Sequence, residues 1–286
     1  MQGKRCLVTG ANTGIGKATA VELARLGAEV VLVCRNEAKG QEAKKEIIHR
    51  TGNEKVDLML CDLAKFKSVR QLVHDIEDRF EHLDVLINNA AIFVTKFIYT
   101  EDKHEMQFQV NHLAPFLLTN LLLDLLKKSA FSRIVNVASD AHFSGKIHFE
   151  DPALSNGYHG MKAYRQSKLA NVLFTYELAR RLVHTGVTAN CLHPGVVHTS
   201  LIDRNSSGFY KYGWILIKPF LITVPQGAKT SVHLATSDEV SDLSGKYFDK
   251  CKSKKSSADS YNPDIASKLW DISEEMTGLK NKIKSQ

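Results

Sequence analysis

The chain has 286 residues, of which 43% are hydrophobic and 24% are charged. These ordinary globular proportions exclude a disordered, collagen-like or coiled-coil protein. Lys and Arg number 38 and Asp and Glu number 31, which gives a formal net charge of +7. This excess suits an anionic ligand or an anionic membrane surface, but it is too diffuse to indicate nucleic-acid binding.

Short β-branched runs alternate along the chain with longer amphipathic runs. The runs that predict strands are Arg5–Thr9, Glu29–Val33, Val56–Leu60, Val85–Asn88, Arg133–Val137, Thr188–Leu192 and Lys246–Phe248. The runs that predict helices are Gly16–Leu26, Asn36–Arg50, Ser68–Phe80, Asp102–Leu126, Ala163–Leu182 and Gln226–Ala235. The strands are continuously apolar, as burial on both faces of a parallel sheet requires. The pattern predicts an α/β, three-layer Rossmann fold, a doubly wound parallel sheet of seven strands, in one domain over residues 1–286.

Two segments depart from this alternation. Residues 201–223 form a long insertion that we expect to act as a substrate lid, and its apolar part, 213–222, contains Trp214 and Phe220. This part either packs on the domain as an ordinary lid helix or dips into a membrane interface, with flanking lysines at anionic headgroups. The segment Lys250–Ser260 is polar and basic, and we expect it to be a mobile loop.

The cysteine and histidine patterns argue against a metal site. The five cysteines form no CxxC pair, so we expect reduced, buried thiols. The 12 histidines form no H-x-x-x-H or Cys/His cluster. No apolar run approaches the roughly 18 residues of a membrane span, and no signal peptide is recognisable. We therefore expect the cytosol or the cytoplasmic face of an intracellular membrane.

A glycine-rich turn lies between the first predicted strand and the first predicted helix. Gly10 allows a tight turn, Gly14 allows the backbone to approach a pyrophosphate, and Gly16 allows the helix to pack close to the strand. The start of the helix offers free N–H groups to phosphate. The intervening residues that would line the same site are Asn12, Thr13 and Ile15. A glycine triplet alone could be a simple turn, but its position at the first strand–helix junction favours a dinucleotide.

The end of the second strand indicates which dinucleotide is bound. An acidic residue there would bind the ribose 2′-hydroxyl of NAD, but this chain has Arg35 and no carboxylate before Glu37. Arg35 can pair with a 2′-phosphate, which favours NADP(H) over the alternative of a solvated arginine. Asp62 and Leu63, after the third strand, lie where the adenine edge would be, although an Asp is also common at a helix start.

Tyr164 and Lys168 lie four residues apart on a predicted helix and therefore on one face. A nearby ammonium group stabilises phenolate and lowers a tyrosine pKa from about 10. Such a tyrosine could protonate a carbonyl oxygen while a nicotinamide delivers hydride, and Ser139, at the end of the fifth strand, could hold the same oxygen.

The Tyr-x-x-x-Lys spacing also occurs at Tyr99/Lys103 and at Tyr158/Lys162. Those tyrosines lie in segments that do not predict helix, so we favour Tyr164. A hydrolase built on Ser139, Asp140 and His142 is not predicted, because no G-x-S-x-G sequence surrounds the serine.

Together these motifs resemble the short-chain dehydrogenase/reductase family, over roughly residues 3–279. The motifs are TGANTGIG at 9–16, Asp62-Leu63, NNAA at 88–91, Asn111, VNVAS at 135–139, Tyr164-x-x-Ser167-Lys168 and Pro194-Gly195-x-x-x-Thr199. The segments TGANTGIGKATA, CRNEAKG, SKLANVLFTYELARRL and HPGVVHTSL are similar to the retinol dehydrogenase subgroup, as is the late KLWDISEEMTGL.

The resemblance implies a role for each motif residue. Tyr164 would donate the proton, Lys168 would bind the nicotinamide ribose and lower the Tyr164 pKa, and Ser139 would hydrogen-bond the substrate carbonyl. Asn111 would anchor a water leading from Lys168 to solvent. The resemblance also implies that Asn89 and Ala90 line the adenosine ribose of the cofactor. Val197 and Thr199 would hold the nicotinamide carboxamide.

The chain departs from the family pattern at Ala91, where a glycine is usual, and this methyl group could crowd the backbone beside the cofactor. Ala138 replaces a common serine without removing a proposed catalytic atom. Many retinol dehydrogenases also carry an N-terminal hydrophobic anchor. Met1 lies a few residues before the first strand, so the chain is either a member without an anchor or a trimmed one.

The first interpretation is therefore an NADPH-dependent reductase of lipophilic aldehydes or ketones, retinal-like or lipid-derived. An oxidative NAD enzyme is disfavoured by Arg35. A non-catalytic NADP-binding regulatory or scaffold protein remains the alternative, although the chain keeps the Ser, Tyr and Lys that such a protein would lose. The physiological substrate remains open, and a homo-oligomer is compatible with the sequence.

Overall fold

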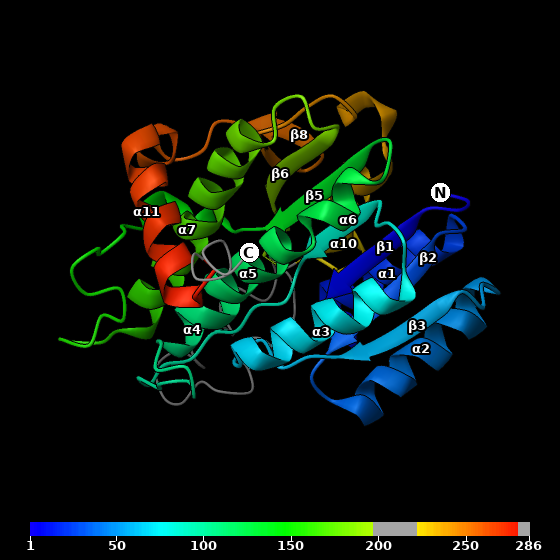
Figure 1. Ribbon diagram of the computed structural model, residues 1–286, viewed down its shortest axis with the longest axis horizontal. Coiled ribbons are helices and arrows are strands. Elements are labelled where there is room, and N and C mark those ends of the chain that lie inside the picture. The colour runs from blue at the N-terminus through cyan, green and yellow to red at the C-terminus, as the bar shows by residue number, and fades with distance from the viewer. Residues whose placement is uncertain (197–221, 280–286) are drawn as a thin grey trace.

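The computed structural model describes residues 1–196 and 222–279 (Figure 1). Within these residues a single sheet has the strand order β3-β2-β1-β4-β5-β6-β7-β8. The strands are β1 (Arg5–Thr9), β2 (Glu29–Cys34), β3 (Val56–Leu60), β4 (Val85–Asn88), β5 (Ser132–Val137), β6 (Val187–His193), β7 (Tyr247–Asp249) and β8 (Lys252–Lys254). The first seven are parallel. The chain order reverses between β1 and β4, and in such folds the crevice beyond this point receives the ligand.

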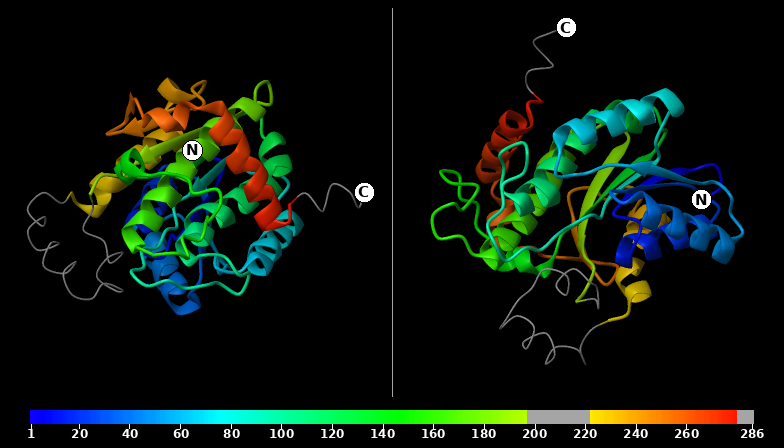
Figure 2. Two further views of the ribbon diagram at one scale, coloured as in Figure 1. Left: turned by 90° about the vertical axis from the view of Figure 1, so that its left-hand side faces the viewer. Right: turned by 90° about the horizontal axis from the view of Figure 1, so that it is seen from below.

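Helices cover both faces of the sheet, which confirms the three-layer α/β Rossmann architecture (Figure 2). Their bounds are α1 (Gly14–Arg25), α2 (Glu37–Thr51), α3 (Phe66–Arg79), α4 (Met106–Phe108), α5 (Ala114–Leu121), α6 (Leu123–Lys127), α7 (Gly160–Arg181), α10 (Val224–Thr236) and α11 (Pro263–Thr277). Alternate residues of β1 enter different cores: Leu7 packs with α3, α5 and α7, whereas Cys6 and Val8 pack with α1 and α10. The continuously apolar strands therefore have two buried faces.

The sheet has one strand more than the seven that the sequence predicts. β8 pairs antiparallel with β7, and its first residues belong to the segment that we expected to be a mobile loop. Lys250 and Cys251 join the strands with positive φ angles of 49° and 62°, as a two-residue hairpin turn requires. The sequence shows no Asn-Gly or similar signal there, and the residues of the Lys-Ser-Lys strand are exposed. The segment 258–261 then forms a 3₁₀ helix, η5 (Ala258–Tyr261).

The single helix expected over Asp102–Leu126 is divided into shorter pieces. A π-helical turn, η1 (Gln109–Leu113), joins α4 to α5, and the Ala114 N–H donates to the carbonyl of Gln109 five residues earlier. Pro115 has no N–H to donate to the carbonyl of Asn111, so α-helical hydrogen bonding cannot continue there. The widened turn sets the direction of the Asn111 side chain.

The remaining sequence-based expectations for the fold concern the insertion. Residues 197–221 lie outside the described residues, and so do Val197, Thr199, Trp214 and Phe220, together with most of the expected lid. Among the described residues, no helix is both long and apolar enough to cross a membrane.

Candidate active site

The glycine-rich turn between β1 and α1 leaves room for a phosphate-bearing ligand. Gly10 and Gly14 have φ angles of 67° and 56°, which other residues rarely adopt. A Cβ at Gly16 would overlap the Gly10 carbonyl oxygen and the Asn89 side-chain amide. Helix α1 begins at Gly14 without a side-chain cap, because Thr13 makes no capping hydrogen bond, and its first turn holds no acidic residue. The turn therefore fits a pyrophosphate, because its helical N–H groups have no competing side-chain acceptor.

Thr9 and Asn89 brace this turn against the end of β4. The Thr9 hydroxyl accepts hydrogen bonds from the Asn89 and Ala90 N–H groups, both at 3.0 Å. The Asn89 side-chain amide donates to the Thr9 carbonyl oxygen at 2.8 Å. Asn89 thus holds the two strand ends together, and Ala90 lies beside Gly10, with the Ala90 Cα 3.0 Å from the position of a Cβ on Gly10. Ala91 follows in the chain and is partly buried.

The residues expected at the adenine end also lie at the carboxyl ends of strands. Arg35 directly follows β2 and is exposed, and within the described residues its guanidinium makes no recorded hydrogen bond or ion pair. Asp62 follows β3 and its carboxylate accepts the Ala64 N–H at 3.1 Å, which forms a local turn. Asp62 does not cap α3, which begins at Phe66 after Lys65. Leu63 is buried.

The structure brings together Ser139, Tyr164 and Lys168. Ser139 follows β5 and begins a 3₁₀ helix, η2 (Asp140–Ser144), where its Oγ accepts the Ala141 N–H at 3.2 Å. Tyr164 and Lys168 lie on α7. The Ser139 hydroxyl lies close enough to the Tyr164 hydroxyl to lower the Tyr164 pKa, and the Lys168 Nζ lies 5.6 Å from the centroid of the Tyr164 ring.

Burial sets the protonation of Tyr164 and Lys168. It raises the pKa of Tyr164 to about 12, although the neighbouring Ser139 hydroxyl acts in the opposite direction. It lowers the pKa of Lys168 to about 8. The Lys168 ammonium donates to the Val137 carbonyl at 3.0 Å and is almost completely buried. Tyr164 is therefore a protonated donor at neutral pH, whereas the expected lowering of its pKa by Lys168 does not overcome burial in this structure.

Comparison with known proteins identifies the family. The family model for short chain dehydrogenases matches residues 4–208. Retinol dehydrogenase 11 from Homo sapiens is 48% identical over 279 residues, which cover 98% of this chain and 87% of that protein. The chain belongs to the short-chain dehydrogenase family. It is an oxidoreductase of the retinol dehydrogenase subgroup, and its family uses nicotinamide cofactors.

Solved short-chain dehydrogenase structures share the fold. An uncharacterized protein from Mycobacterium paratuberculosis superposes with a TM-score of 0.79 and 33% identity, covering 97% of this chain and 94% of the other. A short chain dehydrogenase from Escherichia coli CFT073, complexed with NADPH, has a TM-score of 0.69 and 26% identity, covering 88% of this chain and 98% of the other.

Asn111, the remaining motif residue of this dehydrogenase, connects two parts of the site. Its Oδ1 accepts the Ile92 N–H at 2.8 Å, and its Nδ2 donates to the Ile92 carbonyl and to the Ser167 Oγ, both at 3.0 Å. The side chain thus joins the loop after β4 to α7 beside Lys168. The role of Asn111 in anchoring a water stays a prediction.

The other Tyr/Lys pairs lie apart from Ser139. The Tyr158 hydroxyl donates to Glu105 Oε1 and accepts from Gln107 Nε2, both at 2.9 Å. Burial also raises the pKa of Tyr158. Tyr99 is exposed. Tyr158 therefore makes a structural contact with the start of α4, and this makes it a matched control for Tyr164.

Sequence reasoning missed two residues at the site. Thr9 braces the glycine turn, and the only signal was a hydroxyl directly before Gly10. Phe93 is buried and packs edge-on against Tyr164, with ring centroids 5.7 Å apart. It follows the NNAA motif, and no local pattern indicates that its ring reaches the helix.

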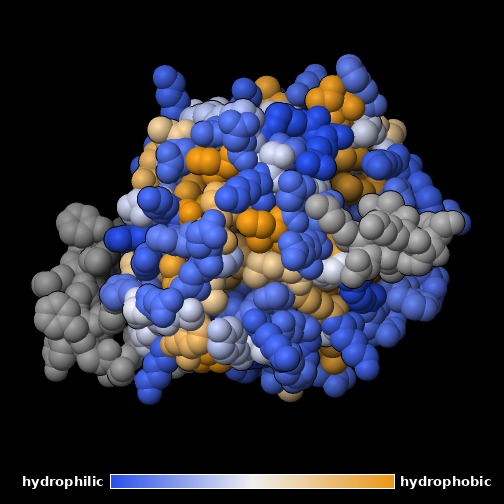
Figure 3. Space-filling view, turned by 60° about the vertical axis from the view of Figure 1, so that its left-hand side comes forward, coloured by the Kyte–Doolittle hydropathy of each residue, from blue (hydrophilic) through white to orange (hydrophobic). Residues whose placement is uncertain are grey.

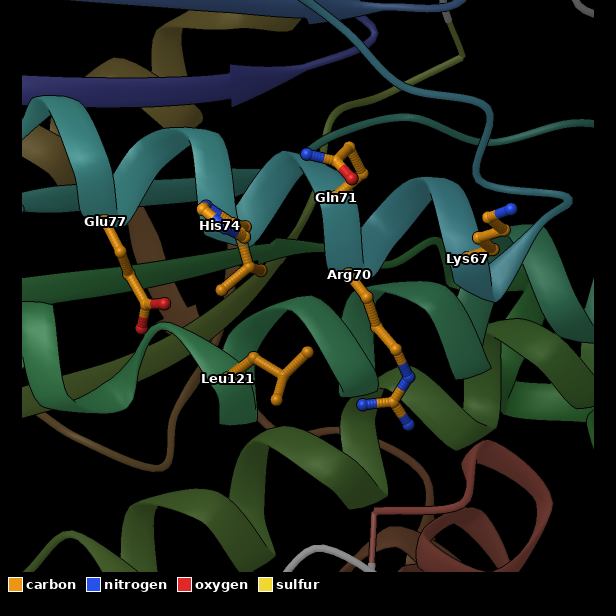
Figure 4. Close-up of a pocket in the computed structure, with 7 residues that line it drawn as sticks. Lys67, Arg70, Gln71, His74, Glu77 and Leu121 are labelled. Carbon is orange, nitrogen blue, oxygen red and sulfur yellow. The ribbon is translucent and has the colours of Figure 1, made fainter.

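A surface cavity of about 510 Å³ lies elsewhere, between α3 and α5 (Figure 4). Its lining residues are Lys67, Arg70, Gln71, Val73, His74, Glu77 and Leu121. None of the candidate site residues lines it. Among the described residues, no group of His, Cys, Asp or Glu side chains could hold a metal ion.

Proposed function

We propose that this dehydrogenase reduces lipophilic aldehydes or ketones to alcohols with NADPH, and that Tyr164 donates the proton. The observation that carries the proposal is the proximity of the Ser139 and Tyr164 hydroxyls, beside the buried Lys168 ammonium. These groups lie at the same edge of the sheet as the glycine turn, because each follows or faces the carboxyl end of a parallel strand.

The chain supplies hydrogen bonds and a proton to the reacting carbonyl. A bound nicotinamide supplies the hydride. Ser139 Oγ–H orients the carbonyl oxygen, and Tyr164 donates its proton to that oxygen as negative charge develops. Lys168 places a positive charge close to the resulting phenolate, which a buried site would otherwise disfavour. With a pKa of about 8, Lys168 is largely charged at neutral pH.

Arg35 supports the choice of NADPH. It is exposed at the end of β2 and no carboxylate lies beside it before Glu37, so a ribose 2′-phosphate would meet a free guanidinium. The relative from Escherichia coli CFT073 was solved with NADPH. The cofactor-binding residues proposed are those of the glycine turn with Arg35, Asp62, Leu63, Asn89, Ala90, Ala91, Val197 and Thr199.

The surroundings of Tyr164 and the relatives support a lipophilic substrate. Phe93 presents an apolar ring to Tyr164, and the relative from Homo sapiens is named a retinol dehydrogenase. Apolar residues also reach the surface in small groups between polar ones (Figure 3). Trp214 and Phe220 of the lid remain proposed substrate contacts. Peripheral membrane contact through 213–222, an intracellular location and a single domain over the chain remain predictions.

The test is turnover of NADPH and of NADH with a panel that contains retinal, long-chain aldehydes and short-chain aldehydes. We expect NADPH oxidation with retinal and the long-chain members and much slower oxidation of NADH. Tight NADPH binding without turnover of any carbonyl would instead support a non-catalytic NADP-binding protein.

A further inference from the structure

The carbonyl oxygen of Ser139 is held by a buried histidine. It accepts the His142 backbone N–H at 3.1 Å and lies 2.7 Å from His142 Nδ1. The other ring nitrogen, Nε2, lies 3.1 Å from the Ser257 backbone nitrogen, which can only donate. Nε2 must therefore be unprotonated, and the proton of the neutral ring is on Nδ1, where it is donated to Ser139. The contacts determine the tautomer.

This ring connects the proposed catalytic serine to a distant part of the chain. We define the C-terminal strap as residues 252–261, which comprises β8 and η5. The His142 side chain is completely buried between the rings of Phe143 and Tyr247, at centroid distances of 4.2 Å and 4.7 Å. One imidazole thus links Ser139, which lies just after β5, to Ser257, which lies just before η5.

The residue after Ser139 is held in a similar way. The Asp140 N–H donates to His193 Nδ1 at 3.3 Å, and the Asp140 carboxylate accepts the Tyr247 hydroxyl at 2.6 Å. Lys254 on β8 lies 3.7 Å from the same carboxylate. The backbone around Ser139 is therefore attached on both sides to the far edge of the sheet.

The titratable groups that surround His142 come from every element packed around η2. They are Asp140 on the same turn, His193 on β6, Tyr247 and Asp249 on β7, Lys254 on β8, Tyr164 and Lys168 on α7, and Asp259 and Tyr261 on η5. Asp140 favours the charged imidazole, whereas His193 and Lys254 disfavour it. Burial is the largest influence and lowers the pKa of His142 below its usual value.

We propose that His142 is a positioning residue that holds Ser139 in place through its neutral Nδ1–H tautomer and the C-terminal strap. This inference rests on the proposed role of Ser139 in carbonyl reduction. Protonation of Nε2 would place its N–H opposite the Ser257 N–H, and two donors cannot form a hydrogen bond. The link between His142 and the C-terminal strap therefore breaks in acid. Activity should therefore fall as His142 titrates, at a pH below the ordinary histidine value of about 6.5.

Two substitutions separate the two ring contacts. His142→Asn places an amide N–H near the position of Nδ1 and keeps the contact with Ser139, but it removes the acceptor for Ser257. His142→Gln places an amide oxygen near Nε2 and removes the donor to Ser139. His184→Asn, at an exposed position with a φ of 66° that asparagine tolerates, is the control.

We expect His142→Gln to lose tenfold or more of kcat with little change in KM for NADPH, because small displacements of a positioning group can reduce turnover by up to about a hundredfold. His142→Asn should have, at neutral pH, the reduced kcat that the wild type reaches in acid, because both lack the link to Ser257, and its kcat should not fall further on the acid side. A wild-type kcat in His142→Gln, or an unchanged acid limb in His142→Asn, would overturn the proposal.

A measurement without turnover keeps the inference distinct from the proposed function. Nitrogen-15 NMR of the histidine rings, with NADPH bound, should show His142 with an unprotonated Nε2 and a protonated Nδ1. The opposite tautomer, or a charged ring at neutral pH, would refute the proposal even if the variants fold poorly. If the expected tautomer is present and no carbonyl is reduced, the proposed function has failed and the linkage to Ser139 stands.

Discussion

The hydroxyl group of Ser139 lies beside that of Tyr164, across the gap between the end of β5 and helix α7, and lowers the Tyr164 pKa that burial raises. A carbonyl oxygen that replaced this contact could accept from both hydroxyls at once. The two side chains are thus positioned for one substrate atom before any substrate is present, and this relationship leads to the first prediction.

Tyr164→Phe should reduce kcat by roughly a hundredfold or more, because the proton donor is lost. Binding of NADPH should change little, because the ring and its contact with Phe93 remain. Steady-state kinetics and NADPH titration measure the two quantities. Tyr158→Phe is the matched control, and it should stay within a few-fold of the wild type because Tyr158 contacts Glu105 and Gln107 instead. An essential Tyr158 would contradict the assignment.

Arg35→Asp should shift the cofactor preference from NADPH toward NADH. Loss of a charge-assisted phosphate contact costs on the order of 1.5–3 kcal/mol, about tenfold to over a hundredfold in Kd. Titration of protein fluorescence with each cofactor measures the ratio of the two constants. Lys128→Asp makes the same charge change at an exposed position before β5 and should leave that ratio unaltered. Equal constants for both cofactors in the wild type would show that Arg35 does not select between them.

Gly16→Ala should weaken NADPH binding by tenfold or more, because the added methyl group overlaps the Gly10 carbonyl and the Asn89 amide. The turn must then open where the phosphates are expected. Gly52→Ala is the control: Gly52 has a φ of 69° but no atom within 4 Å of the added Cβ. That control should lose about 1 kcal/mol of stability and keep its cofactor affinity. Unchanged NADPH affinity in Gly16→Ala would argue against the phosphate site.

Lys168 should make the stability of the cofactor-free protein depend on pH. Burial lowers its pKa from 10.5 to about 8 in the folded state, so between these values the unfolded chain binds more protons. The free energy of unfolding contributed by Lys168 must therefore rise with pH across this window and be lowest below about pH 8. Lys168→Met should remove that slope and abolish turnover. The difference in denaturant stability between wild type and variant, measured across the window, checks the sign, and a difference independent of pH would contradict it.

The lid proposal concerns side chains beyond the described residues. Changing both Trp214 and Phe220 to Ser should reduce co-sedimentation with anionic liposomes, because apolar side chains at an interface supply the affinity. Turnover should fall more for long-chain than for short-chain aldehydes. If the wild type never sediments with liposomes and the variant loses both activities equally, the segment contributes only to a substrate pocket.

Most of the fold can be predicted from the chain because the central strands are mostly apolar and buried on both faces, so single polar residues such as Asn136 and Asn190 do not hide the pattern. The elements that were missed follow β7. Helix α11 has an Asn262 cap, Pro263 at its start and Gly278 at its end, signals that were present but not interpreted. The β7–β8 hairpin could not be foreseen, because Lys250 and Cys251 adopt the positive φ angles that usually require Gly or Asn.

The site was predictable where chain order alone brings groups to one sheet edge, as for Ser139, Tyr164 and the glycine turn. The pKa of Tyr164 could not be predicted from the sequence. The burial that raises it to about 12 depends on packing by residues such as Phe93. The contact of His142 with Ser257 had no signal in the sequence, since the two residues lie 115 positions apart along the chain.

The most direct test of the central claim uses NADPH that carries deuterium in place of the transferable hydride. The measurement is the deuterium content of the retinol formed from retinal. Wild-type enzyme should yield retinol with a single deuterium on the carbinol carbon, and Tyr164→Phe should yield almost none in the same time although it binds the labelled cofactor equally well. Retinol without deuterium, or equal labelling by the two enzymes, would contradict hydride transfer from NADPH with Tyr164 as the proton donor.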